Sequence, residues 1–159
     1  MKKIKFVILA LFAVSCSLFQ KEQTKVPCLP EHSEQFTIRW GECVIKDNSF
    51  VGYEINAYGL LSLYTKNDKY KDGKTEKITT IDADGFCRTL KIANETIVKT
   101  QALYSPGETS KFIEYTNPNN DVFILAVWNP QFQTQGSASY RNLYDSLMAL
   151  VPSAKALKN

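Results

Sequence analysis

The sequence contains a single histidine, His32, and it lacks the short motifs that mark common catalytic and nucleotide-binding sites. There is no G-x-S-x-G turn, no Walker phosphate loop and no G-x-G-x-x-G. His32 follows two prolines in a polar stretch, where nothing would hold an imidazole in a fixed geometry. The composition therefore argues against histidine-based catalysis and against most metal sites, and we expect no metal and no cofactor.

Excess positive charge is confined to the start of the chain. Three of the 19 Lys and Arg residues are Lys2, Lys3 and Lys5, which leaves 16 basic against 16 acidic residues after position 15. A chain with balanced charge has no strong attraction for a polyanion. We therefore expect no nucleic-acid partner, although the full sequence has a formal net charge of +3.

The N-terminal apolar run is short. It covers the nine residues 6–14, and nine helical residues reach only about 14 Å, whereas the core of a bilayer is about 30 Å thick. The run follows three lysines and ends in small residues, as secretory signal peptides do. We therefore interpret residues 1–15 as a signal peptide and exclude them from the fold.

A cysteine directly follows this segment. Ala13-Val14-Ser15-Cys16 resembles the lipobox of bacterial lipoproteins, in which Leu is usual where this chain has Ala13. The resemblance, which covers residues 1–17 only, implies cleavage before Cys16 and lipid on its sulfur. The protein would then be anchored in the cell envelope, with the outer membrane as the expected site. The alternative is an ordinary signal peptide, which would give a soluble secreted or periplasmic protein.

Three other cysteines remain, namely Cys28, Cys43 and Cys87. An oxidising envelope compartment favours a disulfide, but three thiols cannot all pair. Cys43 falls near the end of a predicted strand, and Cys87 falls on the first turn of a predicted helix that must pack on the sheet. We favour a bond between Cys43 and Cys87, with Cys28 as a close alternative partner for either.

The organisation of the mature chain follows from composition. Residues 17–35 are polar, contain two prolines and show no periodicity, so 16–35 are predicted to be the lipidated cysteine and a tether. Periodic patterns begin at Phe36, and they predict one globular domain over 36–152 with a tail at 153–159.

Two periodicities alternate within that domain. Period-two patterns predict strands at 36–40, 50–55, 60–65, 111–115 and 122–128. Apolar steps of three and four predict two helices. One has about fifteen residues and is capped by Thr80, Asp82 or Asp84, and the other begins near Ser137 or Ser139 and stops before Pro152. The charged stretch 66–77 is interpreted as a loop.

The resulting order is β-β-β-α-β-β-α with short connections. Strands joined by tight turns pair antiparallel, and amphipathic helices need an apolar surface to cover. We predict an α+β domain in which an antiparallel sheet of about five strands carries both helices on one face.

Aromatic residues make up 12% of the chain, and several fall near predicted strand ends or turns. Aromatic rings beside polar groups suit recognition of peptides or sugars. The candidates are Trp40, Tyr64, Trp128 and Phe132. The alternative is that most of these rings fill the core.

These observations favour a membrane-anchored envelope lipoprotein. Its domain is expected to be a non-catalytic module that binds an envelope protein, peptide or glycan, with the lipid on Cys16 as its contact with the membrane. Two alternatives stay open. One is a small envelope enzyme that uses Cys87 or carboxylates such as Asp82 and Asp84, and the other is a passive structural component.

Overall fold

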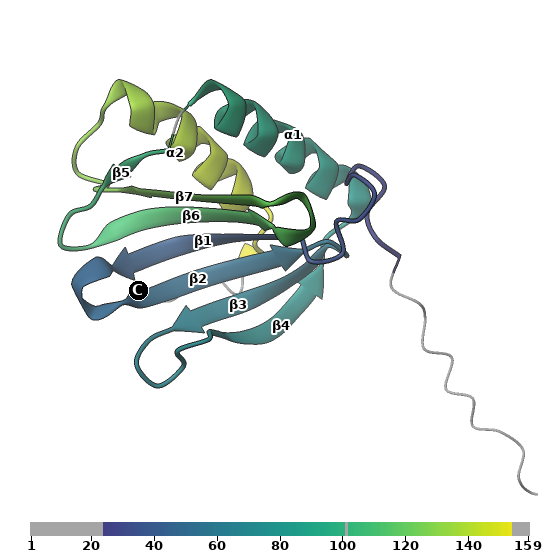
Figure 1. The fold of residues 1–159 in the computed structure, drawn as a ribbon, viewed down its shortest axis with the longest axis horizontal. Helices are drawn as coiled ribbons and strands as arrows, with labels where there is room; N and C mark the ends of the chain where they lie inside the picture. The colour runs from purple at the N-terminus through teal and green to yellow at the C-terminus, as the bar shows by residue number, and fades with distance from the viewer. Residues whose placement is uncertain (1–23, 101, 154–159) are drawn as a thin grey trace, which may run out of the picture.

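The computed structural model describes residues 24–100 and 102–153. Seven strands in these ranges form one sheet in the order β4-β3-β2-β1-β6-β7-β5, and two helices accompany it (Figure 1). The predicted signal peptide, Cys16 and most of the tail lie outside the described residues. The elements are β1 (Thr37–Val44), β2 (Ser49–Asn56), β3 (Leu60–Lys66), β4 (Lys74–Thr80), α1 (Ala83–Lys99), β5 (Tyr104–Ser105), β6 (Ser110–Asn117), β7 (Val122–Trp128) and α2 (Gln135–Met148), with short 3₁₀ turns η1 (Ile45–Asp47) and η2 (Pro118–Asn120).

Both helices cover the same face of the sheet. Ile38 and Trp40 of β1 are 1% and 0% exposed, and they belong to one apolar cluster with residues of α1 and α2. Side chains of a strand alternate between faces, so the odd-numbered neighbours Arg39, Gly41 and Cys43 point to the other side. We call that other side, which neither helix covers, the open face of the sheet (Figure 1).

Local chemistry explains where the helices begin. The Asp82 carboxylate accepts the N–H of Gly85 at 2.7 Å and caps α1, which satisfies one of the free amides of the first turn. Helix α2 is capped by Thr134 in a reciprocal box with Ser137. Asp82 is thus one of the three expected caps, whereas the second helix, expected to begin near Ser137 or Ser139, begins two residues before Ser137, at Gln135.

The α+β class with two helices is confirmed, but the sheet has seven strands rather than about five, and one of its strand pairs is parallel. Strand β4 begins within the charged stretch 66–77 that was interpreted as a loop, and the two-residue strand β5 pairs in parallel with β7. The sheet is therefore mixed rather than purely antiparallel. Strand β4 escapes prediction because it is an edge strand whose first four residues are exposed and which places a single apolar residue, Ile78, against the core, so it shows no apolar alternation.

Strands β1 and β2 approach each other unusually closely at Gly41 and Gly52, which are register partners. A Cβ atom on Gly41 would collide with the carbonyl oxygen of Val51, and one on Gly52 would collide with that of Trp40. Only glycine fits at this crossing, because every other residue would force the two backbones apart.

The folded body begins earlier than the predicted boundary at residue 36. Val26 and Leu29 are 6% and 7% exposed and belong to the main core cluster. The Val26 N–H donates to the Ala57 carbonyl at 3.0 Å, and the Asn117 amide donates to the buried Ser33 hydroxyl at 3.1 Å. This part of the expected tether is therefore packed against the domain. Within the described ranges, neither helix combines the length and the apolar character needed to span a bilayer.

Candidate functional site

Two of the four candidate aromatic residues belong to the core. Trp40 and Trp128 are 0% and 1% exposed. Trp40 lies against Tyr53, and Trp128 packs against two tyrosines of α2. Both tryptophans point toward the helices, so their expected role in facing a ligand is wrong. Burial of these large apolar rings accounts for their presence.

Tyr64 lies on the open face and is 4% exposed. The guanidinium of Arg39 stands 4.6 Å from the centre of its ring, and Gly73 of the β3–β4 connection lies against the ring edge. Burial raises the pKa of Tyr64 above its ordinary value, and the positive charge of Arg39 opposes that shift. Tyr64 is therefore covered by its own chain rather than presented to a ligand.

Arg39 joins two carboxylates at the centre of the open face. Its Nε donates to Glu54 Oε2 and its Nη1 donates to Glu114 Oε1, each at 2.7 Å. Burial alone would lower the pKa of Arg39, but the hydrogen bond to Glu54 and the charges of both carboxylates raise it above the ordinary value. The charges of these three side chains compensate one another, and their hydrogen bonds link β1 to β2 and to β6. The cluster therefore stabilises the sheet and leaves no unpaired charge among the three for a ligand.

The cysteines pair differently from the favoured expectation. The disulfide joins Cys28 to Cys87, and Cys43 is a buried free thiol. Cys43 points to the open face, where it packs with Phe112 and Val127, whereas Cys87 lies in a helix on the opposite side. The sheet itself therefore separates Cys43 from Cys87, and the expected bond between them is wrong.

The disulfide and the helix cap involve two of the residues that were considered as catalytic groups, Cys87 and Asp82. The sulfur of Cys87 is bound in the disulfide and is not a free thiolate nucleophile. The carboxylate of Asp82 caps α1. In the described ranges, no cluster of three or more His, Cys, Asp and Glu side chains has the spacing to hold a metal ion.

Cys43 is expected to resist alkylation in the folded protein. Burial raises the pKa of its thiol from 9.0 to about 11, so the thiolate fraction near pH 8 is about a hundredfold below that of an ordinary thiol. Between pH 9 and 11 the unfolded chain loses this proton and the folded chain keeps it, so this thiol makes the fold less stable as pH rises through that window.

Iodoacetamide labelling at pH 8, followed by peptide mapping, measures this protection. We expect Cys43 to be labelled within minutes in urea and at least a hundredfold more slowly without it. Cys28 and Cys87 should stay unlabelled in both samples without reductant, which serves as the internal control. Equal labelling rates at Cys43 with and without urea would contradict its burial.

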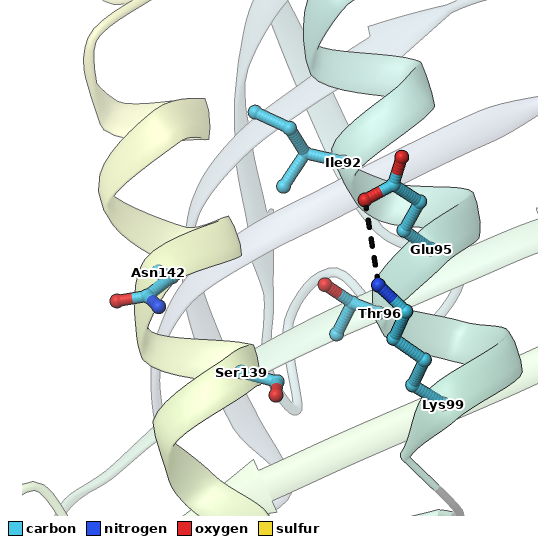
Figure 2. A pocket seen from close by; sticks show the side chains of 6 residues that line it. All are labelled: Ile92, Glu95, Thr96, Lys99, Ser139 and Asn142. Carbon is cyan, nitrogen blue, oxygen red and sulfur yellow. Dashed lines mark ion pairs between the residues drawn. The ribbon is translucent and has the colours of Figure 1, made fainter.

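A polar groove separates α1 from α2 (Figure 2). It consists of a hollow of about 150 Å³ and a neighbouring hollow of about 420 Å³ that shares Lys99 and Ser139. An ion pair spans 3.7 Å between Lys99 and Glu95, whose side chains are 73% and 52% exposed, so it contributes little rigidity. The side chains drawn in Figure 2 are Ile92, Glu95, Thr96, Lys99, Ser139 and Asn142.

This groove can donate and accept hydrogen bonds, but its charged lining residues Glu95 and Lys99 are exposed to solvent, and Thr96 is its buried polar side chain. Neither hollow is lined by a histidine or a cysteine. The groove is thus a shallow surface between helices, without the converging, desolvated polar groups of a developed active site.

Phe132 is the candidate aromatic residue that faces solvent, with 67% of its surface exposed. It lies in the segment 129–134 between β7 and α2. Arg141 of α2 donates hydrogen bonds to three carbonyl oxygens of this segment, at 3.1 Å to Asn129, 3.1 Å to Pro130 and 2.8 Å to Phe132. The exposed ring of Phe132 therefore belongs to a connection whose backbone is held by three hydrogen bonds from Arg141.

Arg141 was missed in the sequence. Its position in the sequence is the one signal that could have identified it. Arg141 directly follows the buried Tyr140 and therefore lies beside the apolar stripe of α2, where a long side chain can reach the preceding connection.

The register of the sheet places the chain connections at two opposite ends. Thr37 pairs with both Asn56 and Thr116, so the turns 57–59 and 118–121 lie beside the segment that leads into β1. We call this the entry end. Cys43 pairs with Phe50 and Ser110, and Lys111 pairs with Trp128, so the connections 45–48, 67–73, 106–109 and 129–134 gather at the other end. We call this the loop end, on the left in Figure 1.

A scan of the chain against protein-family models finds no match, and a search of curated proteins finds no significant relative. The function must therefore be argued from the geometry of the domain.

Proposed function

We propose that this protein is a lipid-anchored component of the cell envelope whose domain binds a protein, peptide or glycan with its loop end. The observation that supports the proposal is that the entry end and the loop end lie at opposite ends of the sheet. The described chain begins at Thr24 beside the entry end, and four connections gather at the far end of the sheet (Figure 1).

The distance between the expected anchor and the domain is limited by chain length. Thr24 is eight positions after Cys16, and a fully extended chain over eight residue steps reaches at most about 29 Å. With lipid on Cys16, the entry end faces the membrane and the loop end projects into the surrounding compartment. Loops held by a rigid scaffold are where binding residues concentrate.

The anchor is tested by the intact mass of the protein recovered in the detergent phase from its native cells. We expect the mass of residues 16–159 plus diacylglyceryl, with or without a third acyl chain and with one disulfide. A free Cys16, or cleavage at another bond, would replace the anchored protein by a soluble secreted one.

The binding end is tested by photo-crosslinking in the same cells. The crosslinking residue p-benzoylphenylalanine replaces Asp72 or Gln133 at the loop end, or Asn120 at the entry end, all three of which are exposed. We expect adducts from the loop end. Adducts from Asn120 alone would place the partner at the entry end and overturn the proposal.

A further inference from the structure

The segment 129–134 has no helix or strand, yet it is ordered by its own hydrogen bonds. The N–H of Asn129 donates to the Ser105 carbonyl at 2.9 Å, and the N–H of Gln131 donates to the Asn129 side chain at 2.9 Å. At its other end Thr134 forms the capping box with Ser137. Both ends of the segment are therefore fixed to regular elements.

Arg141 holds the middle of the segment from one side. Its Nη1 and Nη2 atoms reach the carbonyls of Pro130, Asn129 and Phe132, and its Nε donates to the Ser137 hydroxyl at 3.4 Å. The planar guanidinium is suited to such multiple acceptors. The carbonyls of Pro130 and Phe132 are bound to Arg141 of α2, while the side chains of Gln131, Phe132 and Gln133 are exposed.

A large apolar side chain on an ordered segment is an efficient binding group. Phe132 is 67% exposed, so its ring has most of its apolar surface available to a partner. Binding costs less when the backbone that carries such a ring is already fixed. Aromatic side chains that fill a partner's pocket and are surrounded by neutral contacts dominate many protein interfaces.

The surroundings of Phe132 narrow the class of partner. The stretch 129–136 reads NPQFQTQG and contains no charged residue. Binding to an anionic lipid surface or another polyanion relies on Lys and Arg beside the apolar group. Arg141 does contact the segment, but its guanidinium donates to three backbone carbonyls and to the Ser137 hydroxyl, so its donors are already engaged within the protein. Uncharged amides around one ring instead match the polar rim and apolar centre of a protein interface.

We propose that Phe132 inserts into an apolar pocket of a partner protein and that Arg141 is the positioning residue that holds it ready. This inference deepens the proposed function and rests on it, because it names the class of partner and the residue at the loop end that binds it.

Photo-crosslinking from position 133 of the full chain in its native cells provides the test. With Phe132→Ala, we expect the yield of the protein adduct to fall at least tenfold, since loss of a central anchor raises Kd about thirtyfold. The matched control is Phe123→Ala, because Phe123 is 63% exposed at the entry end. That variant should keep the full yield.

The outcomes separate the two proposals. If adducts form at the loop end and Phe132→Ala leaves their yield unchanged, the inference is overturned and the proposed function stands. An adduct that mass spectrometry identifies as a glycan or a lipid would overturn the proposal that the partner is a protein. Absence of every loop-end adduct overturns both.

Arg141→Met tests the positioning role. It keeps the apolar stem and removes every donor, and we expect the adduct yield to fall three- to tenfold with Phe132 present. In the Phe132→Ala background the same change should have no further effect, because Arg141 acts through Phe132. An equal fold loss in both backgrounds would show a general effect on the fold and would overturn the assignment.

Discussion

Replacing Cys28 and Cys87 together by serine is expected to lower the free energy of unfolding by about 4 kcal/mol. The bond connects residues 59 positions apart, and a cross-link over a loop of that length removes many conformations from the unfolded chain. It also fixes the segment around Val26 and Leu29 to the start of α1. A domain of this size has a total stability of roughly 5–15 kcal/mol, so the loss is a large fraction.

Urea denaturation followed by tryptophan fluorescence measures the change, since both buried tryptophans report on the core. Cys43→Ala is the matched control, because it removes a buried sulfur without removing a cross-link. It should cost about 1 kcal/mol. If the free energy of unfolding of the double serine variant is within about 1 kcal/mol of the native value, the cross-link between the N-terminal segment and the helix is contradicted.

Gly41→Ala is expected to lower the free energy of unfolding by about 3 kcal/mol, which is near the upper end for overpacking by one methyl group. The added Cβ would meet the backbone of Val51 and Gly52, and the backbone has no alternative rotamer that could relieve the contact. The two central strands must therefore separate locally, and the main core behind Trp40 is disturbed with them.

The comparison is with Gly136→Ala, measured by the same urea titration. Gly136 lies in α2, and the nearest atom to its added Cβ is a Leu103 methyl carbon at 3.9 Å. Alanine favours a helix over glycine, so this variant should gain about 0.5–1 kcal/mol. If the two alanine variants change stability by the same amount, the steric account of the β1–β2 crossing is wrong.

The elements that were found from sequence are those that bury one face. The strand around Trp40 and the stripe of α1 alternate clearly because each must exclude water on one side only. Strand β4 and the two-residue β5 bury too little to leave a pattern. The packed segment around Val26 and Leu29 was taken for a tether because prolines and polar residues surround its few apolar anchors.

The disulfide could have been inferred from alternation alone. Ile38 and Trp40 mark the core side of β1, and Cys43 is an odd number of residues from both, so it belongs to the opposite face. That argument excludes a bond to a helix on the core side and leaves Cys28 for Cys87. Phe132 could be named as an exposed aromatic residue, but its fixation by Arg141 depends on how β7 and α2 meet, which no local pattern encodes.

Strand β4 influences how copies of this protein meet each other in a crowded compartment. Its outer edge has unpaired backbone groups among the described strands, and a bare edge of that kind would pair with the same edge of a second molecule into one continuous sheet. Lys74, Glu76 and Lys77 keep water at that border, because stacking two such edges would strip hydration from every one of these charges. The charges on β4 therefore oppose the joining of two copies through this edge, even where the protein is concentrated.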